Sequence, residues 1–273
     1  MSELQKRILL AVIAAPLFMG VVWMGGWSFK IMMLAVVFII QWEMAAMFNE
    51  GGTRPSRPFM YTIGFWVMML PHIPFPYLWG LALFLLLIAS EIIRGADRSY
   101  SSLVHTIFCG LYAPIGILTL LLLREQIFPD DLFAGFVLTA SVLMMVWGND
   151  VFAYFAGKNF GKNLLAPKIS PKKTWEGFAG GFAGALAGLV IVMMLARPEA
   201  ISLLLLLPAV ILVSVFGPVG DLAASKLKRM YDTKDSSNIL PGHGGFFDRF
   251  DALLLAAPAV YLYLEVLRIS GII

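Results

Sequence analysis

The sequence predicts an all-α, polytopic membrane protein, and three observations support this prediction. Of the 273 residues, 60% are hydrophobic and only 14% are charged, whereas roughly 25% of residues are charged in an ordinary soluble domain. The mean hydropathy is +0.84. Apolar stretches long enough to cross the hydrocarbon layer, which takes roughly 20 residues, follow one another along the chain between short polar or Pro/Gly joints. The bilayer is therefore the expected solvent.

Nine transmembrane helices are predicted from hydropathy and helix-breaking residues. The first follows Lys6 and Arg7 and is interpreted as a retained span, because no small-residue cleavage pattern follows it. The third and fourth are separated only by a joint that contains Pro71, Pro74 and Pro76, so one broken or re-entrant element is the alternative there. The predicted spans lie near residues 8–24, 28–48, 58–74, 77–94, 103–123, 132–156, 175–196, 201–228 and 248–267.

The distribution of Lys and Arg predicts a cytoplasmic N-terminus. With nine spans, Arg124, Arg197 and Arg268 fall outside, and Lys30 lies in the second span near its outer end, where its side chain reaches the interface. The other sixteen of the twenty basic residues then lie inside, as the positive-inside rule requires. They are Lys6, Arg7, Arg54, Arg57, Arg94, Arg98, Lys158, Lys162, Lys168, Lys172, Lys173, Lys226, Lys228, Arg229, Lys234 and Arg249. Any active face is therefore expected on the cytoplasmic side.

The chain reads as a single integral membrane domain with two functional regions. Residues 1–130 are expected to form a scaffold with dimer or lipid contacts, and residues 131–273 a catalytic region. Two cytoplasmic loops, 157–176 and 217–251, combine lysines with carboxylates and glycines, which membrane topology alone does not require. The single cysteine, Cys109, excludes a disulfide framework and a thiolate metal site. Any metal must therefore be held by oxygen.

Loop 217–251 begins with a predicted break at Gly217-Pro218, after which several polar side chains recur at helical spacing. Asp221, Ser225, Lys228 and Asp232 lie at i, i+4, i+7 and i+11, so in a helix they share one face. Ionisable groups at the edge of a span are costly and are functional candidates by default. The alternative is a local pair between Asp221 and Ser225 or Lys228.

The second half of that loop, 234–251, is too polar and glycine-rich for a membrane helix until its end. Its glycines around His243 favour close approach of backbone amides to phosphate, or else form a tight turn. Asp248 is placed to cap the last helix, with Asp251 in the first turn. Capping does not exclude metal binding, and Asp221 with Asp248 would supply the carboxylates that Mg²⁺ prefers.

Loop 157–176 predicts a helix that starts near the membrane surface. Ser170 resembles an N-cap and Pro171 a first helical residue. Lys172 and Lys173 would then lie in the first turn, where the helix dipole disfavours cations, so the site is suited to an anion. A purely topological lysine pair is the alternative. Glu176 either pairs with Lys173 or orients a ligand.

Other polar and small residues fall within the spans. Asp150 is an intramembrane carboxylate, with Tyr154 one turn later, and is a candidate for the metal or nucleotide site. Glycines at four-residue spacing predict close packing of a neighbouring helix; they are Gly180, Gly184 and Gly188. The remaining acids of the spans are assigned structural or interfacial roles; they are Glu43, Glu91 and Glu265.

Residues 225–251 carry a pattern with many fixed positions. It reads Ser225-x-Leu227-Lys228-Arg229, four residues, Lys234-Asp235-x-Ser237, then Leu240-Pro241-x-His243-Gly244-Gly245-Phe246-x-Asp248-Arg249-Phe250-Asp251. This pattern resembles, without departure, the signature of the phosphatidate cytidylyltransferase family, which makes CDP-diacylglycerol from CTP and phosphatidic acid. Asp150 with Phe152-Ala153-Tyr154, and Ser170-Pro171-Lys172-Lys173-Thr174 with Glu176-Gly177, look like the companions of that signature. Residues 1 to about 130 resemble the family only in hydropathy.

The resemblance implies a Mg²⁺-dependent nucleotidyltransferase of phospholipid biosynthesis. It further implies a homodimer in the inner membrane of the cell, in contact with membrane lipids but not nucleic acid, using Mg²⁺ or another hard divalent cation and allowing a monovalent cation. The implied metal carboxylates are Asp221 and Asp248, with Asp251 as a third candidate. The implied catalytic residues are Asp221, Asp248, Lys228, Arg229 and His243. Those implied to bind CTP or the lipid phosphate are Asp150, Ser170, Lys172, Lys173, Ser225, Lys234, Asp235, Gly244, Gly245 and Arg249.

Two other function classes fit parts of the pattern. A CTP-dependent lipid kinase, or a cytidylyltransferase for another lipid phosphate, would use the same kind of phosphate site. A secondary transporter would explain many spans with broken helices and buried acids. However, the sequence has no clear internal repeat, and its ionisable groups gather toward one side. A transporter is therefore the weaker alternative.

Overall fold

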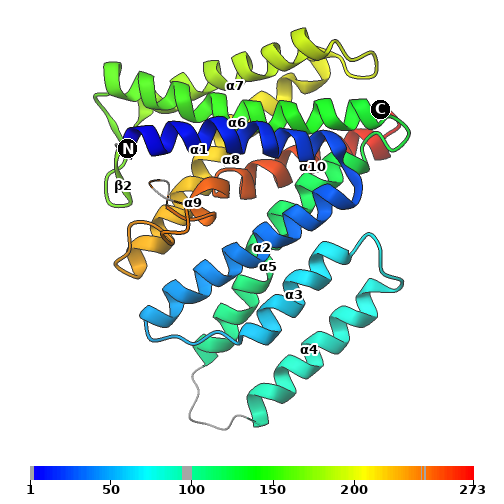
Figure 1. Ribbon diagram of the computed structural model, residues 1–273, viewed down its shortest axis with the longest axis vertical. Coiled ribbons are helices and arrows are strands. Elements are labelled where there is room, and N and C mark those ends of the chain that lie inside the picture. The colour runs from blue at the N-terminus through cyan, green and yellow to red at the C-terminus, as the bar shows by residue number, and fades with distance from the viewer. Residues whose placement is uncertain (1–2, 94–99, 241, 243) are drawn as a thin grey trace.

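The computed structural model describes residues 3–93, 100–240, 242 and 244–273, with side chains from residue 12 onward. Within these ranges the chain is almost entirely helical, so the all-α prediction is confirmed (Figure 1). The only strands there form a small antiparallel hairpin. In chain order the elements are α1 (Glu3–Met24), α2 (Gly26–Glu50), α3 (Arg57–Met69), α4 (Pro76–Ile93), α5 (Tyr100–Glu125), α6 (Leu132–Phe160), β1 (Leu164–Ala166), β2 (Ser170–Thr174), α7 (Trp175–Ala196), α8 (Leu203–Met230), α9 (Phe247–Phe250) and α10 (Leu253–Ile269).

The described helices confirm a polytopic membrane protein. Seven of them are long and apolar enough to cross a bilayer, when α9 and α10 are taken together as Phe247–Ile269. The other two elements that match predicted spans are shorter. The apolar part of α1 covers Val12–Met24, and α3 has 13 residues. The predicted count of nine therefore stays a prediction.

The proline-rich joint between the third and fourth predicted spans is a turn between two separate helices. Figure 1 shows α3 and α4 side by side as an antiparallel hairpin. The indole Nε1 of Trp66 donates to the carbonyl of Pro76 at 3.1 Å. The same ring packs on Gly80, where a Cβ would overlap it. At the turn, Phe75 has a φ of 50°.

Helix α8 continues without interruption through Gly217 and Pro218, so the break predicted there is wrong. Proline removes one backbone hydrogen bond, but the helix is supported here from outside. Gly220 leaves room for the start of α10, since a Cβ at this position would overlap the carbonyl oxygen of Asp251. The polar turns at the end of α8 therefore continue one helix, and Asp221 and Lys228 project from a rigid element.

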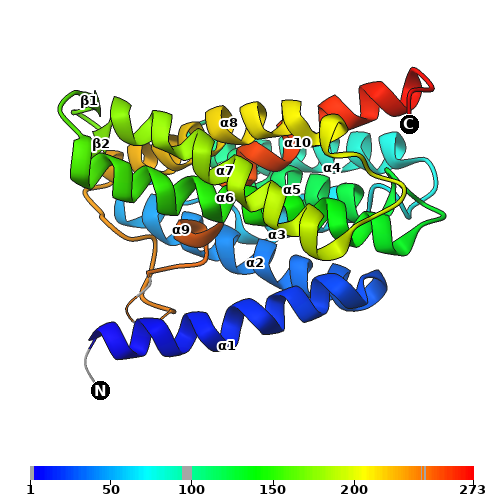
Figure 2. The ribbon, with the colours of Figure 1, turned by 90° about the horizontal axis from the view of Figure 1, so that it is seen from above.

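Helices α6 and α7 pack along the predicted glycine stripe. A Cβ at Gly184 would overlap the carbonyl of Gly148, and a Cβ at Gly188 would overlap that of Met144. Such backbone proximity is the usual role of small residues between membrane helices. The pair lies along one side of the bundle, and Figure 2 shows α1 along another edge. The close pairing fixes the position of Asp150 on α6 relative to β2, which precedes α7.

The two ends of the bundle carry different elements. In Figure 1 the N-terminus, the β hairpin, α9 and the C-terminal end of α8 lie toward the left, and the C-terminus lies toward the right. At the right end, buried Arg124 donates to the carbonyls of Val22 and Trp23 at 2.9 and 3.1 Å, closing the turn between α1 and α2. The left end carries the loops in which chemistry was predicted.

Candidate active site

A cavity of about 740 Å³ opens at the end of the bundle that carries the β hairpin, between α6, the hairpin, α7, α8 and α9. Its charged lining is balanced, with five aspartates and five basic residues. These are Asp150, Asp221, Asp235, Asp248, Asp251, Lys158, Lys172, Lys173, Lys228 and Arg249. Both predicted loops contribute, so folding brings together residues that lie up to a hundred positions apart in the chain.

One ion pair joins the hairpin to α8. Lys173 Nζ lies 2.6 Å from Asp221 Oδ2, and the hydroxyl of Ser225 donates to Asp221 Oδ1 at 3.2 Å. The predicted alternative of a local pair between Asp221 and Ser225 is therefore observed, but Asp221 also faces the cavity. Lys228 does not pair with Asp221, because it belongs to a second ion pair.

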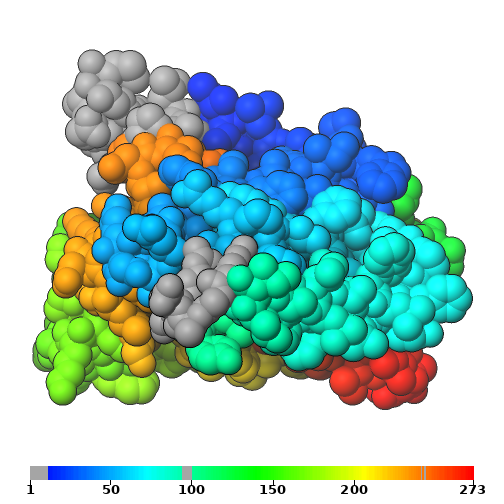
Figure 3. All heavy atoms as spheres, turned by 90° about the horizontal axis from the view of Figure 1, so that it is seen from below, coloured from blue at the N-terminus to red at the C-terminus, as the bar shows by residue number. Residues whose placement is uncertain are grey.

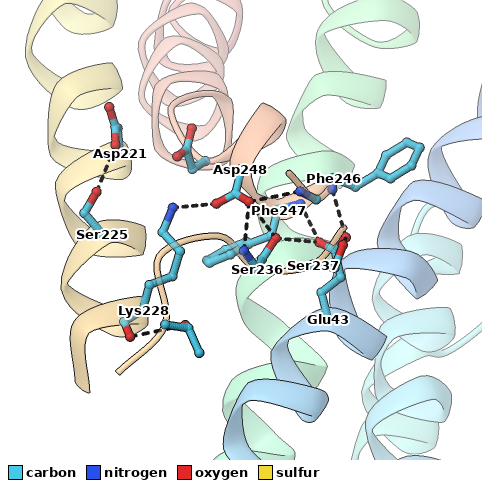
Figure 4. Close-up of polar contacts among 12 residues, drawn as sticks. Glu43, Asp221, Ser225, Lys228, Ser236, Ser237, Phe246, Phe247 and Asp248 are labelled. Carbon is cyan, nitrogen blue, oxygen red and sulfur yellow. Dashed lines mark hydrogen bonds and ion pairs between the residues drawn. The ribbon is translucent and has the colours of Figure 1, made fainter. Parts of the chain in front are cut away.

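That second ion pair is almost fully buried. Lys228 Nζ lies 2.5 Å from Asp248 Oδ1, with side chains 10% and 5% exposed. Asp248 Oδ2 accepts hydrogen bonds from the amide and hydroxyl of Ser236, at 2.8 and 3.0 Å, and from the amide of Gly245 at 3.0 Å. A carboxylate offers about four lone-pair sites. The protein therefore saturates Asp248, which ties α8, α9 and the loop 231–246 together (Figure 4).

Glu43 on α2 holds the same loop from the opposite side (Figure 4). Its fully buried carboxylate accepts from the hydroxyl of Ser237 at 2.6 Å and from the amides of Phe246 and Phe247, at 2.9 and 2.7 Å. The Ser236 hydroxyl lies 3.1 Å from Glu43 as well as 3.0 Å from Asp248, so the two carboxylates share its one proton. A structural role was predicted for Glu43, but not its contact with the signature loop. The only signal in the sequence is a carboxylate within a long apolar run.

The glycines of this loop act mainly through the backbone. Gly242 and Gly244 have φ values of 75° and 77°, in the region that favours glycine. At Gly245, a Cβ would overlap both the Ser236 hydroxyl and the Glu43 carboxylate. Backbone conformation and close packing therefore explain why glycine occupies positions 244 and 245. The predicted contact of these two residues with substrate stays a prediction. His243 lies outside the described residues.

The predicted helix start at Ser170-Pro171 is wrong. Residues 170–174 form strand β2, paired with β1, and α7 begins at Trp175 with Thr174 as its N-cap, accepting from the Gly177 amide at 3.1 Å. Ser170 and Thr174 are both good capping residues, but Thr174 also ends the strand register opposite Leu164. Proline lacks a donor and is tolerated in an edge strand.

This correction moves two predicted phosphate ligands from a helix to a strand. Lys172 and Lys173 still line the cavity, beside Gly177 and Phe178 from the first turn of α7. Glu176 lies in the first turn of α7 and accepts from the amide and side chain of Asn163 at 3.2 and 2.8 Å. Of the two roles considered for Glu176, pairing with Lys173 is therefore not observed.

Six predicted site residues in the described part of the chain do not line the cavity, namely Gly244, Gly245 and four others. Ser170 is half-buried in the hairpin, and Ser225 reaches the site only through Asp221. The side chain of Lys234 is exposed, and Arg229 donates to the carbonyl of Thr233 at 3.2 Å. Asp232, predicted on the same helical face as Asp221, lies beyond the end of α8 with a φ of 52°. The helical spacing therefore ends at Lys228.

Asp248 was predicted to be the N-cap of the last helix, and the structure does not place it there. Phe246 occupies the position before α9, and Asp248 lies inside this one-turn helix. The reason is that its carboxylate is already engaged by Lys228, Ser236 and Gly245. Asp251 is 9% exposed, and one of its oxygens accepts the adjacent Ala252 amide at 2.7 Å.

The carboxylates that face the cavity fit a hard cation only with help from a substrate. Within residues 3–93, 100–240, 242 and 244–273, no group of three His, Cys, Asp or Glu side chains is close enough to enclose a metal. Asp150 has no hydrogen bond or ion pair in the described chain, and the second oxygen of Asp251 is likewise unpaired there. Mg²⁺ is normally bound by one or two carboxylates plus substrate phosphates and water. The oxygen donors therefore fit such an ion.

Comparison with known proteins gives a consistent result. The cytidylyltransferase family matches residues 5–267. A phosphatidate cytidylyltransferase of Bacillus subtilis is 34% identical over 97% of this chain and 98% of its own length. Similar proteins of the same name occur in Brucella abortus, 33% identical over 96% of this chain and 94% of the relative, and in Pseudomonas aeruginosa, 34% identical over 93% and 94%.

Proposed function

The chain belongs to the cytidylyltransferase family, and we propose that it transfers the cytidylyl group of CTP to phosphatidic acid, giving CDP-diacylglycerol and pyrophosphate. The observation that carries this proposal is the charged cavity at one end of a set of membrane-spanning helices. Such a site is open to a water-soluble nucleotide and lies within reach of a lipid headgroup. The names of the relatives supply the two substrates.

In the proposed reaction, an oxygen of the lipid phosphate attacks the α-phosphorus of CTP. A new phosphorus–oxygen bond forms, the bond from the α-phosphorus to the bridging oxygen breaks, and pyrophosphate leaves with the electron pair. No covalent enzyme intermediate is needed. The barrier is the approach of two polyanions, so the protein has to position them and neutralise their charge.

Three cations of the cavity are free to do this. Lys158, Lys172 and Arg249 have no ion-pair partner among the described residues, and all three are exposed. Lys158 lies 6.0 Å above the ring of Tyr154. We assign these three to the phosphates of CTP and the lipid. Lys173 and Lys228 are held by Asp221 and Asp248 and add positive charge from fixed positions.

A divalent cation such as Mg²⁺ would supply charge neutralisation and orientation of the triphosphate. We propose that one or two of three cavity carboxylates, those of Asp221, Asp251 and Asp150, would provide its protein oxygens, with substrate phosphates and water completing the shell. Asp221 is 34% exposed, and the other two have unpaired oxygens on the cavity. Asp248, which the family signature also suggests, would bind a metal only after releasing some of its present donors. We assign it first to positioning of the loop.

This division of roles makes different predictions for two aspartates. We expect Asp221→Asn to raise the Mg²⁺ concentration for half-maximal activity by at least about tenfold, a loss of roughly 1.4 kcal/mol in metal binding, with partial recovery in excess Mg²⁺. Asp248→Asn should abolish CDP-diacylglycerol formation at every Mg²⁺ concentration, because the loop loses its anchor. Mg²⁺ titration of purified variants measures both. Recovery of Asp248→Asn by excess Mg²⁺ would instead make Asp248 a metal ligand.

We further propose that the cavity faces the cytoplasm across the inner membrane and that the protein is a homodimer. The nine-span arrangement predicted from the sequence puts sixteen of the twenty Lys and Arg residues on the same side of the membrane as loops 157–176 and 217–251, which supports this orientation. The dimer is implied by the family resemblance, and the mass of the purified protein in a native detergent complex tests it.

Labelled CTP tests the reaction itself. Detergent-purified protein is incubated with Mg²⁺, phosphatidic acid and CTP labelled at either the α- or the γ-phosphate. Cytidylyl transfer moves only the α-label into lipid, whereas a CTP-dependent lipid kinase moves only the γ-label. Failure of both labels to enter lipid, with phosphatidic acid and with diacylglycerol as the acceptor, would contradict an enzyme of either kind. A parallel incubation with diacylglycerol in place of phosphatidic acid should leave both labels in water.

A further inference from the structure

A second hollow lies on the outer surface of the bundle, where α2, α3 and the loop after α8 meet. It is an open apolar groove of about 540 Å³. Its lining consists of Phe38, Ile39 and Trp42 from α2, Tyr61 from α3 and Ile239 from the loop. The rings of Phe38 and Tyr61 meet edge to face at 5.5 Å, and Trp42 and Ile239 are 41% and 43% exposed. None of these residues lines the candidate active site.

The position of the groove identifies membrane lipid as its occupant. Helix α2 is one of the candidate spans, so its outward face meets the bilayer. Trp42 and Phe38 lie one turn apart on that face. Tryptophan and tyrosine are characteristic of the membrane interface, where an apolar ring meets the headgroup region. An acyl chain is the apolar group available at this depth.

A cation at the end of the groove favours an anionic lipid. Arg57, the first residue of α3, is exposed and lies one turn before Tyr61. Arg57 has no ion-pair partner in the described part of the chain, and the first turn of a helix is an unfavourable place for a cation. A lipid phosphate would remove both penalties.

We propose that this groove binds an anionic phospholipid of the surrounding bilayer as a resident lipid, with an acyl chain against Phe38 and Trp42 and the phosphate at Arg57. Ile239 places the lipid in contact with the loop that Glu43 anchors through Ser236 and Ser237. Figure 3 shows the orange atoms of this loop beside the blue atoms of α2 on the same face. The lipid therefore packs on the outer side of a loop whose inner side faces the active-site cavity through Asp235.

Quenching by brominated acyl chains tests the proposal without substrate or turnover. The purified protein is placed in phosphatidylcholine vesicles that contain, at the same fraction, brominated phosphatidylglycerol, brominated phosphatidic acid or brominated phosphatidylcholine. The chain has seven tryptophans, so the signal of Trp42 is obtained as the difference between the natural protein and Trp42→Phe. We expect the anionic lipid to occupy the groove about fivefold more strongly, which one arginine near the membrane surface supplies.

Charge variants make the test specific. Arg57→Gln should abolish the preference for the anionic lipid, and Arg57→Lys should retain it. Arg197→Gln provides the matched control, because it removes the same charge at the far end of α7 and should leave the preference intact. The quenching of the other six tryptophans, unchanged in each variant, verifies the fold.

Three results would overturn the proposal. Equal quenching of Trp42 by neutral and anionic lipid in the natural protein would make the contact non-specific. No quenching of Trp42 by either lipid would mean that protein, such as a second copy of this chain, covers the groove. A preference for brominated phosphatidic acid without one for phosphatidylglycerol would make the groove an entry site for substrate instead of a site for a resident lipid.

Discussion

At the scale of single residues, two buried carboxylates on opposite sides determine the shape of the signature loop. Asp248 and Glu43 together accept hydrogen bonds from four backbone amides and two hydroxyls of the loop and the start of α9. The amides are those of Ser236, Gly245, Phe246 and Phe247, and the hydroxyls are those of Ser236 and Ser237. Hydrogen bonds to a charged acceptor each contribute roughly 1.5–3 kcal/mol. The loop is therefore held by short-range polar contacts, in addition to the packing of Tyr231 and Phe246 against the core.

Glu43→Gln tests this anchoring function. The substituted amide nitrogen would face two donors in a buried site, so we expect activity to fall by about a hundredfold, or roughly 2.7 kcal/mol. The loss should appear in kcat more than in the KM for CTP, because Glu43 does not line the cavity. Protease cleavage within residues 232–246 should become faster. Glu265→Gln, which neutralises an acid paired with Arg268 on α10, should change neither quantity.

Two lysines of the cavity should respond differently to removal of charge. Lys228→Met leaves Asp248 buried without its ion-pair partner, so we expect unfolding to become easier by about 3 kcal/mol and activity to be lost. Lys172→Met removes an exposed charge without a protein partner and should change stability by less than about 0.5 kcal/mol while raising the KM for CTP. Denaturant titration and steady-state kinetics measure these effects. Equal stability of the two variants would contradict the buried pair.

At the scale of elements, the sequence predicted the helices well and the hairpin poorly. Hydropathy located α2, α5, α6, α7 and α8 because each is a long apolar run. The strands β1 and β2 have only three and five residues and owe their pairing to the ends of α6 and α7. Such short strands leave no periodic pattern. The helical start at Ser170 was a reasonable local interpretation that tertiary pairing overrode.

For the candidate site, the sequence predicted which residues gather but not how they pair. Nine of the proposed site residues, from Asp150 to Asp251, line one cavity, because the motifs mark both loops. The pairing could not be predicted, since Lys173 meets Asp221 and Lys228 meets Asp248 across elements whose relative positions depend on packing. Glu43 was missed as a loop anchor because nearly two hundred residues separate it from Ser236.

The α6–α7 contact gives a prediction at this scale. Gly184→Ala should destabilise the protein by about 1–3 kcal/mol, because the new Cβ overlaps the carbonyl of Gly148 and forces the helices apart. Activity should fall too, since α6 carries Asp150. Gly20→Ala is the matched control, because Gly20 lies in α1 with nothing within 4 Å of an added Cβ. Thermal unfolding in detergent compares them, and equal midpoints would argue against close helix packing.

At the scale of the whole molecule, the candidate active site lies at one end of the helix bundle. The β hairpin, the end of α8 and α9 share the end that holds the cavity, and the joints between α3 and α4 and between α7 and α8 lie at the other end (Figure 1). A protein that joins a soluble nucleotide to a membrane lipid needs only one such end. This polarity also distinguishes it from a transporter, whose site is expected near the midplane.

Thiol labelling tests the polarity and the number of spans together. Native Cys109 is buried and provides a silent background. In intact cells, a membrane-impermeant reagent should label Glu199→Cys, in the joint after α7, and His72→Cys, in the turn after α3. Lys168→Cys, in the β hairpin, should react only after permeabilisation. The three positions lie on exposed residues.

The result at His72 decides the status of α3. A 13-residue helix is about 20 Å long at 1.5 Å per residue, shorter than the roughly 30 Å hydrocarbon layer, so α3 reaches the far side only if the bilayer thins or the flanking residues complete the span. We expect labelling, because the turn at 70–75 is proline-rich and His72 itself is exposed. Protection of His72→Cys both before and after permeabilisation, with Glu199→Cys still labelled from outside, would place the turn within the bilayer. The α3–α4 pair would then be a re-entrant hairpin, and the chain would cross the membrane fewer than nine times.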